Sequence, residues 1–173
     1  MKVVANAGPL MALGKLALVH LLSQLYGLVM VPSAVYEEVV VCGLELGQPD
    51  AYAIELAIAR KELKVVDMND ADLWDIVCAL PLDRGEKQVI QLGLRESADW
   101  VLLDDWLARE EAQRLGLKVK GTLGVIAQAY RQGLMSLNEV ELIFQAIIAR
   151  EDIWISDALV RCVWDELRGA WEG

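Results

Sequence analysis

Residues 3–13 read VVANAGPLMAL, a short apolar run, one polar residue, and then Gly-Pro at the start of a second apolar segment. Proline is favoured in the first turn of a helix, because its missing N–H is not needed there. The stretch therefore predicts a strand at Val3-Val4 and a helix that starts near Gly8-Pro9. Asn6 stands at the junction, where an amide side chain commonly caps the helix that follows.

The same order of strand and helix start recurs along the chain. Strand-like runs at 28–31, 100–103 and 118–120 are followed by Pro32-Ser33, Asp104-Asp105 and Thr122 respectively. A helix near 51–60, a strand at 63–66 and a helix near 86–94 are expected between them. Alternating strands and helices predict an α/β fold with a central parallel sheet covered by helices on both faces.

After residue 135 the pattern changes to helices without intervening strands. Ser136 and Glu139 have the spacing of a capping box, and Ser156 marks a further helix start. We expect an α/β domain at 1–135 and a C-terminal helical extension at 136–173 that packs on the same domain. The last helix carries a stripe at helical spacing, which suits the core and leaves a dimer surface open: Val160, Val163, Trp164, Leu167 and Trp171.

Composition limits the choice of partners. The chain has 173 residues, 55% of them hydrophobic, which fits one well-filled α/β domain with its extension. Its 26 acidic residues outnumber 16 basic ones, and a net charge of -10 repels a polyanion at long range. Any contact with RNA is therefore expected to be local and assisted by a metal ion.

The cysteines and the longest uncharged stretch indicate a reducing, aqueous location. Cys42, Cys78 and Cys162 lie far apart without metal-ligand spacing, so we expect reduced core residues in a cytoplasmic protein. The uncharged residues 16–36 include His20 and Pro32, which argue against a membrane span. Residue 1 is expected to begin the fold without a signal peptide.

Four side chains stand behind strand-like runs, and an α/β sheet would gather them at one edge: Asn6, Glu38, Glu86 and Asp105. Carboxylates at close range repel one another, and a hard divalent cation between them removes that repulsion. Phosphodiester hydrolysis is the most plausible chemistry for such a cluster. Taken singly, each position also suits a helix start, since Glu86 follows Asp83 at capping-box spacing and Asp104-Asp105 would cap the next helix.

These residues lie in motifs that resemble the PIN domain, in particular a compact prokaryotic branch of that family. The resemblance runs through the quoted stretch 3–13 and then through 31–39 (VPSAVYEEV), 82–86 (LDRGE), 102–105 (LLDD), 121–124 (GTLG) and 153–156 (IWIS). It covers the chain nearly end to end.

The resemblance implies a three-layer α/β/α fold and a Mg²⁺- or Mn²⁺-dependent endoribonuclease that cleaves single-stranded RNA, often as the toxin of a toxin–antitoxin pair. It implies catalytic roles for Glu38, Glu86 and Asp105. The same three residues and Asn6 align with the metal site, with Asp104 as a substitute ligand or a residue behind the ligands. Thr122 would orient a water or a phosphate oxygen, and a small antitoxin protein would be the partner.

The position of Asn6 leaves a second interpretation open, because active members of the family usually place an aspartate there. The alternative is a catalytically impaired PIN-like module that acts by binding RNA or protein. A phosphatase or phosphoacceptor domain of another doubly wound family would use the same sheet edge, although no suitable Lys and Ser/Thr set accompanies the acids. Trp154 and Trp164, with Trp171, also suggest a homodimer.

Overall fold

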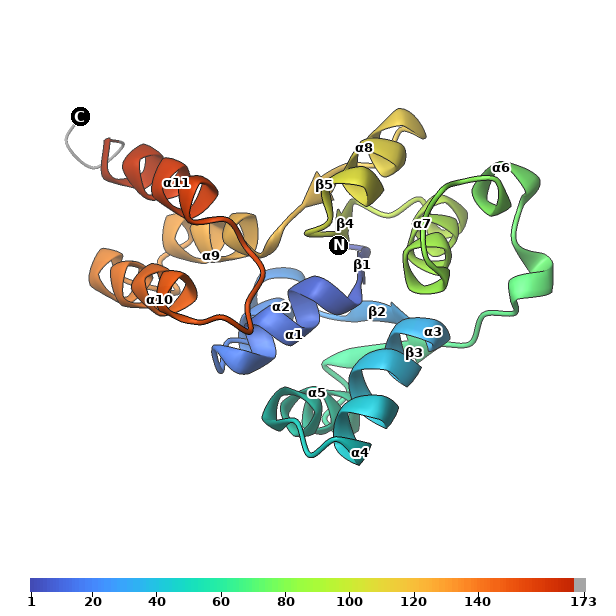
Figure 1. Ribbon diagram of the computed structural model, residues 1–173, viewed down its shortest axis with the longest axis horizontal. Coiled ribbons are helices and arrows are strands. Elements are labelled where there is room, and N and C mark those ends of the chain that lie inside the picture. The colour runs from blue at the N-terminus through green and yellow to red at the C-terminus, as the bar shows by residue number, and fades with distance from the viewer. Residues whose placement is uncertain (170–173) are drawn as a thin grey trace. The chain divides into compact units, whose positions relative to one another are not determined.

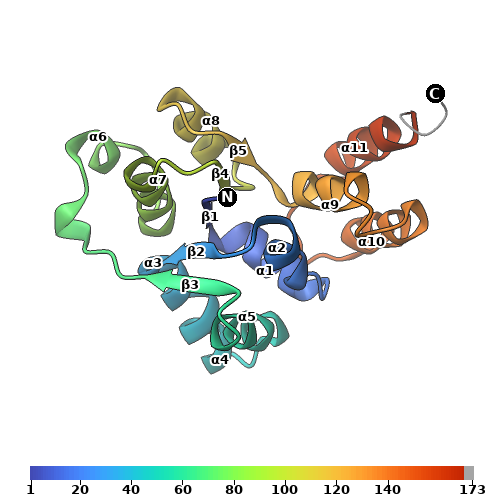
Figure 2. The ribbon, with the colours of Figure 1, turned by 180° about the vertical axis from the view of Figure 1, so that it is seen from behind.

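A computed structural model of the chain describes residues 1–169. Its core is a sheet of five parallel strands in the order β3-β2-β1-β4-β5 (Figures 1 and 2). The strands are β1 (Val3–Ala5), β2 (Val29–Pro32), β3 (Leu63–Val66), β4 (Trp100–Leu102) and β5 (Val119–Lys120). All five strand positions match those expected from the sequence, and the predicted parallel sheet is confirmed.

Residues 1–169 also form helices, and some of these begin at a residue whose side chain caps the first turn. They are α1 (Ala7–Lys15), α2 (His20–Tyr26), α3 (Ser33–Tyr36), the π-helix η1 (Glu37–Cys42), α4 (Gly43–Glu45), α5 (Pro49–Ala59), the 3₁₀ turn η2 (Asp70–Asp72), α6 (Asp75–Cys78), α7 (Arg84–Glu96), α8 (Trp106–Arg114), α9 (Thr122–Arg131), α10 (Leu137–Ala149) and α11 (Asp157–Gly169). The helix α7 packs across β1, β2 and β4. The α/β fold with additional C-terminal helices is thus confirmed.

The order of the strands reverses between β1 and β4. The chain runs outward from β1 to β2 and β3 on one side, then returns to pair β4 with the other side of β1. Ala5 pairs with Leu102, and the backbone N–H of Asn6 donates to the Leu102 carbonyl oxygen at 3.0 Å. Ligands of open α/β sheets bind at such a reversal of strand order. Asn6 and the Asp104-Asp105 pair both stand there.

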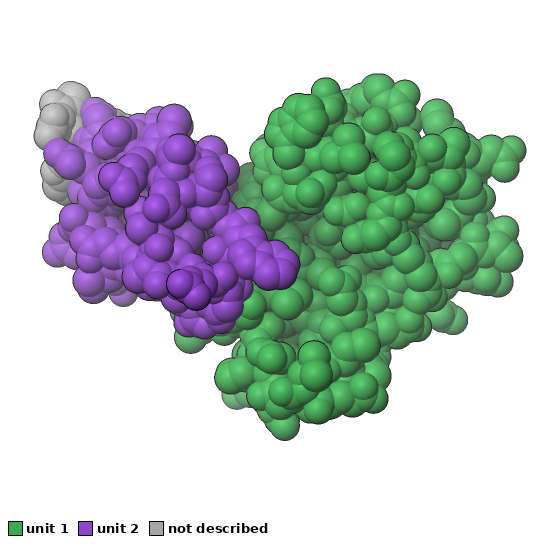
Figure 3. All heavy atoms as spheres, viewed as in Figure 1, with its two compact units in different colours: residues 1–122 green, residues 123–173 purple. Residues whose placement is uncertain are grey.

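The chain divides into two compact units, residues 1–122 and 123–173, shown in different colours in Figure 3. The second unit has a small core of its own. Val160 and Leu167 of α11 are buried, and Trp164 meets the Phe144 ring edge-on with centroids 6.2 Å apart. The core function expected for this part of the stripe is observed, whereas Trp171 lies outside the described residues.

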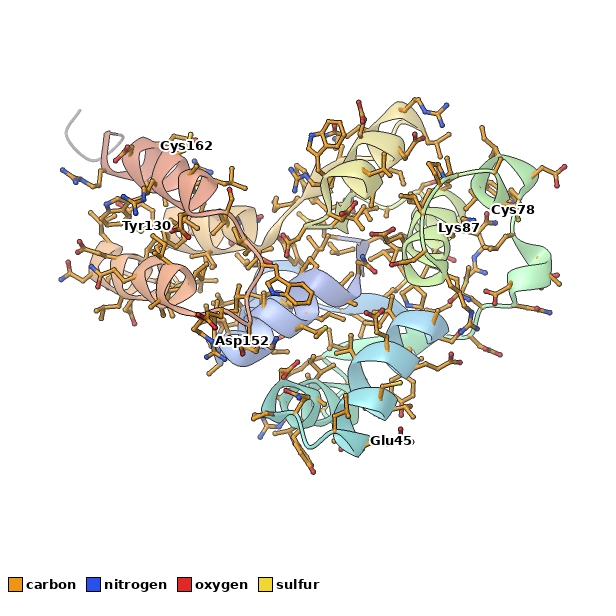
Figure 4. The ribbon with its side chains drawn as sticks, in the orientation of Figure 1. Glu45, Cys78, Lys87, Tyr130, Asp152 and Cys162 are labelled. Atoms are coloured by element: carbon orange, nitrogen blue, oxygen red, sulfur yellow. The ribbon has the colours of Figure 1, made fainter. Side chains whose placement is uncertain are left out.

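The cysteines correct one expectation. Cys42, Cys78 and Cys162 are free, but all three are exposed rather than part of the core. Cys78 and Cys162 lie on the outer sides of α6 and α11 (Figure 4). The apolar face of each short helix, not the hydrophobicity of the thiol, decides which side chains are buried.

Among residues 1–169, no single helix has the length and apolar character to cross a membrane. Helices α1 and α2 have that length and apolar character only when taken together, and the chain bends by 119° between them.

Candidate metal centre

Glu86 is fixed at the start of α7 by a capping box. Its backbone N–H donates to Asp83 Oδ1 at 2.8 Å, and its own Oε2 accepts from the backbone N–H of Asp83 at 3.2 Å. The box predicted from the sequence is therefore present. The side chain is nevertheless only 9% exposed, an unusual position for a carboxylate with no cationic partner among its hydrogen bonds.

Glu38 approaches the same helix end from another segment. It lies in η1, whose π-helical turn follows α3 directly and leads into α4. Its Oε2 would be 3.6 Å from a Cβ added at Gly85, in the first turn of α7. π-Helical turns are rare and often occur at functional sites. The Glu38 carboxylate is thus held close to the Asp83–Glu86 capping box.

Asp105 completes the group from the end of β4. It is the N-cap of α8, and its Oδ1 accepts from the backbone N–H of Ala108 at 2.9 Å. The capping function expected from the sequence is therefore observed. The residue is exposed, and the next side chain, Trp106, is 71% exposed. The second carboxylate oxygen of Asp105 has no hydrogen bond from the described residues, so it is available to a ligand.

We refer to Glu38, Asp83, Glu86 and Asp105 as the acidic cluster, because their charges interact. Burial raises the pKa of Glu86, and repulsion from Asp83, Asp105 and Glu38 raises it further. Partial burial also raises the pKa of Glu38, with Asp83 adding to the shift. Repulsion within the cluster therefore opposes the ionisation of Glu38 and Glu86. A divalent cation would reverse this effect.

The donor chemistry of the cluster fits a hard cation. Carboxylate oxygens are the ligands that Mg²⁺ prefers, and neither a thiol nor an imidazole belongs to the group. As the side chains stand, no three His, Cys, Asp or Glu within residues 1–169 approach closely enough to form a coordination site. The acidic cluster of the described residues is therefore gathered within electrostatic range but not within coordination distance of a single ion.

Asp104 has a different environment from its neighbour Asp105. Its Oδ1 accepts from the Thr122 backbone N–H at 2.7 Å, and its Oδ2 accepts from Thr122 Oγ1 at 2.6 Å. A Cβ added at Gly121 would stand 2.8 Å from both Asp104 Oδ1 and Arg109 Nη1. Asp104 therefore caps α9 from outside that helix, and both its oxygens are occupied. Thr122 is fully buried, and its hydroxyl donates to Asp104.

Asn6 lies at the carboxyl end of β1, beside the end of β4, as expected. It is the N-cap residue of α1 but makes no capping hydrogen bond with its side chain, and it is only 7% exposed. A Cβ at Gly8, two residues later, would be 3.5 Å from Asp104 Cβ, which shows how closely the start of α1 approaches the end of β4. The predicted role of Asn6 in a metal site stays a prediction.

The basic residues nearest these motifs are engaged by protein groups. Arg84 pairs with Glu37 and Asp70, and Arg109 Nη1 donates to the Leu103 carbonyl oxygen at 2.9 Å. Lys87 Nζ donates to the carbonyl oxygen of Cys78 at 3.0 Å, and both residues are labelled in Figure 4. Each of the three is therefore anchored by at least one protein group.

Two residues at the site, Asp83 and Gln88, were not identified from the sequence as functional. Asp83 is explained by the capping box, so nothing in its spacing indicates that it also raises the pKa values of Glu38 and Glu86. Gln88 is fully buried and bonds to residues far away in sequence. A buried polar residue on the apolar face of a predicted helix would have been the signal.

Comparison with known proteins agrees with this architecture. No curated protein matches the sequence. A family model described as a PIN domain matches residues 2–168, which is nearly the whole chain and includes every residue of the acidic cluster. The parallel sheet, the helices around it and this match lead to one conclusion: the chain belongs to the PIN domain family.

Proposed function

We propose that this protein is a Mg²⁺- or Mn²⁺-dependent endoribonuclease whose metal centre is the acidic cluster. PIN domains are in general nuclease-type proteins that use divalent metal ions. The observation that carries the proposal is that Glu38 and Asp105 both raise the pKa of Glu86, although the three stand on different segments of the chain. Helix capping accounts for Glu86 and Asp105 separately, but it gives no reason for the three to converge.

The residues divide the work of phosphodiester hydrolysis. Glu38, Glu86 and Asp105 supply the anionic oxygens that hold the cation, directly or through water, and Asp83 adds negative charge behind them. A bound cation lowers the pKa of an attacking water and stabilises charge on the phosphate and the leaving oxygen. No side chain of the protein needs to act as the nucleophile. Asp104, bonded to Thr122, keeps the end of β4 in place.

Single-stranded RNA is the proposed substrate. Trp106 directly follows Asp105 and is 71% exposed, and it shares one face of α8 with Arg109, Glu110 and Gln113. Stacking of a base on an exposed aromatic ring contributes about 1–3 kcal/mol and needs no positive field. This mode of binding suits a chain with a net charge of -10. The bases of a single strand are free to stack, whereas those of a duplex are not.

The proposal is tested by Mn²⁺ calorimetry at neutral pH together with cleavage of single-stranded RNA in the same samples. Asp105→Asn should abolish both, because asparagine keeps the helix cap but loses the charge. The matched control is Asp99→Asn, since Asp99 stands before β4, at the opposite end of the strand, and accepts from the Lys2 backbone N–H at 2.7 Å. Equal Mn²⁺ affinities in wild type, Asp105→Asn and Asp99→Asn would refute the metal centre.

A second candidate function rests on Asn6. An amide at this buried position supplies one anionic oxygen fewer than an aspartate would, which favours a catalytically impaired module that binds RNA or protein. Asn6→Asp separates the two candidates. If the wild type binds Mn²⁺ and cuts RNA, the nuclease stands; if only Asn6→Asp does, the natural chain is a binding module.

The biological setting is part of the proposal. We place the protein in the cytoplasm as the toxin of a toxin–antitoxin pair, held in check by a small antitoxin protein, and we propose a homodimer. Exposed apolar side chains such as Trp154, 94% exposed, support protein contacts. Light scattering tests the dimer, and a monomer at micromolar concentration would end that part of the proposal. Co-expression with the product of a neighbouring small gene tests the antitoxin.

A further inference from the structure

Gln88 stands at the centre of a buried hydrogen-bond network that joins three segments of the first unit. It lies on α7, two residues after Glu86, and is fully buried. Its Oε1 accepts from the Ala34 backbone N–H at 2.9 Å, and its Nε2 donates to Asp70 Oδ1 at 2.6 Å. A single side chain thus connects α7 to the start of α3 and to the 3₁₀ turn η2.

The bond to Ala34 caps the helix that carries Glu38. Ala34 is in the first turn of α3, where backbone N–H groups have no partner inside the helix. Glu38 comes one turn later, in the π-helical continuation of α3. Because Glu86 and Gln88 share α7, the Gln88–Ala34 bond sets the position of the Glu38 segment against the helix that bears Glu86.

Ser33 Oγ and the Met68 carbonyl oxygen, each 3.5 Å from an amide atom of Gln88, hold the same joint from the side. Ser33 Oγ donates to the Met68 carbonyl oxygen at 3.2 Å and accepts from the Met68 backbone N–H at 3.1 Å. Arg84 bridges Asp70 and Glu37 on the outer surface. Exposed ion pairs like those of Arg84 contribute little, whereas a buried amide that loses its partners is costly. Gln88 is therefore the dominant member of the network.

We propose that Gln88 is a positioning residue for the metal centre: it fixes the spacing between Glu38 and Glu86 without touching the metal or the RNA. This inference rests on the proposed function. Residues that orient metal ligands from behind typically change metal affinity by about 10–100-fold when they are replaced. We expect Gln88→Leu to weaken Mn²⁺ binding by at least about tenfold.

The chain supplies a matched control on the same helix. Gln91 is also buried, at 4% exposure, and its Oε1 accepts from the Trp74 backbone N–H at 3.1 Å. That bond holds the segment before α6, which carries no member of the acidic cluster. Gln91→Leu should therefore lower stability as Gln88→Leu does but leave Mn²⁺ affinity within about twofold of wild type.

An exchange of the two side chains tests the network without removing it. Gln88→Glu keeps an acceptor for Ala34 but sets two carboxylates against each other, so Mn²⁺ affinity should fall. Asp70→Asn alone keeps an acceptor for Gln88 and should be nearly neutral. In the double variant Q88E/D70N, the asparagine introduced at position 70 can donate to the glutamate introduced at position 88, and affinity should return to within about threefold of wild type. This rescue also covers the case in which Gln88→Leu fails to fold.

The experiment is Mn²⁺ calorimetry on wild type and these five variants, together with hydrogen exchange of the Ala34 amide in the absence of metal. The proposal requires weakened Mn²⁺ binding in Gln88→Leu and Gln88→Glu and fast Ala34 exchange in Gln88→Leu. Neither change should occur in Gln91→Leu, and Mn²⁺ affinity should recover in Q88E/D70N. Equal Mn²⁺ affinities in the Gln88 and Gln91 variants overturn the positioning role and leave the proposed nuclease intact. Wild-type protein that binds no Mn²⁺, with Ala34 still protected by Gln88, overturns the metal centre and with it this role.

Discussion

Asp104 and Asp105 are neighbours in sequence, yet the protein uses them in opposite ways. Both oxygens of Asp104 accept hydrogen bonds from buried Thr122, whereas Asp105 is exposed and uses one oxygen to cap α8. Both oxygens of the Asp104 carboxylate are hydrogen-bonded within the fold, whereas one oxygen of Asp105 accepts no hydrogen bond from the described residues. Two acids at the end of one strand therefore predict nothing about function until their hydrogen-bond partners are known.

The largest effect that we expect is on the free energy of unfolding, when Asp104 is replaced. Asp104→Ala leaves the Thr122 backbone N–H and hydroxyl without partners in a fully buried position. We expect a loss of about 3 kcal/mol in the free energy of unfolding. Urea unfolding followed by circular dichroism measures it. Thr122→Val, which removes only the hydroxyl, should cost clearly less; equal losses in both variants would contradict the two-bond account.

A substitution at Gly121 tests how tightly the residues around Asp104 are packed. A Cβ at this position would lie 2.8 Å from Asp104 Oδ1 and from Arg109 Nη1, closer than a Cβ normally approaches an oxygen or a nitrogen atom. Gly121→Ala should therefore destabilise the protein by about 2 kcal/mol. Gly8→Ala is the control, since its Cβ would meet Asp104 at an ordinary 3.5 Å and alanine favours the helix. A tolerant Gly121→Ala would show that the Asp104 cap can shift.

Asp105→Ala is expected to separate stability from metal binding. It removes one helix cap, at a cost of about 1 kcal/mol, and by the proposed function it eliminates Mn²⁺ binding. Ser136→Ala removes a comparable cap, because Ser136 Oγ accepts from the Glu139 backbone N–H at 3.2 Å, but it lies outside the acidic cluster. Similar unfolding curves and different Mn²⁺ isotherms are expected. Retained Mn²⁺ binding in Asp105→Ala would reduce Asp105 to a cap.

Sequence alone predicted the features that depend on neighbours along the chain. All five strand positions and the capping boxes at Asp83 and Ser136 follow from apolar runs and short spacings, and each is present. The π-helical form of η1 and the short helix α6 did not follow, because tertiary packing selects them over other local structures. The exposed cysteines were missed for the same reason: burial depends on which helix face meets the core.

The site could be predicted only in part. Parallel strands bring their carboxyl ends to one edge, so the positions of Asn6 and Asp105 follow from the topology. The hydrogen bond between Thr122 and Asp104 joins residues 18 apart in sequence, and the one between Ala34 and Gln88 joins residues 54 apart. No local spacing encodes such bonds. The difference between an occupied and an available carboxylate therefore required the folded structure.

The smallest expected effect is the pH dependence of stability in the acidic cluster. Burial and neighbouring carboxylates raise the pKa of folded Glu86 above its ordinary value of 4.5. Between neutral pH and that value, the folded state takes up a proton before the unfolded state does, so stability rises as pH falls. Glu86→Gln cannot take up this proton and should gain less stability over the same window. Asp104, whose pKa burial also raises, contributes equally to both proteins.

Urea midpoints of wild type and Glu86→Gln near pH 7 and pH 5 measure this difference. A parallel series at saturating Mn²⁺ sharpens it, because a metal ligand must be deprotonated to bind. With the metal present, protonation of Glu86 opposes binding, so acidification should destabilise the wild type instead of stabilising it. If the two proteins respond identically to pH with and without Mn²⁺, Glu86 is a structural carboxylate like Asp104. The proposed metal centre would then lose its most buried ligand.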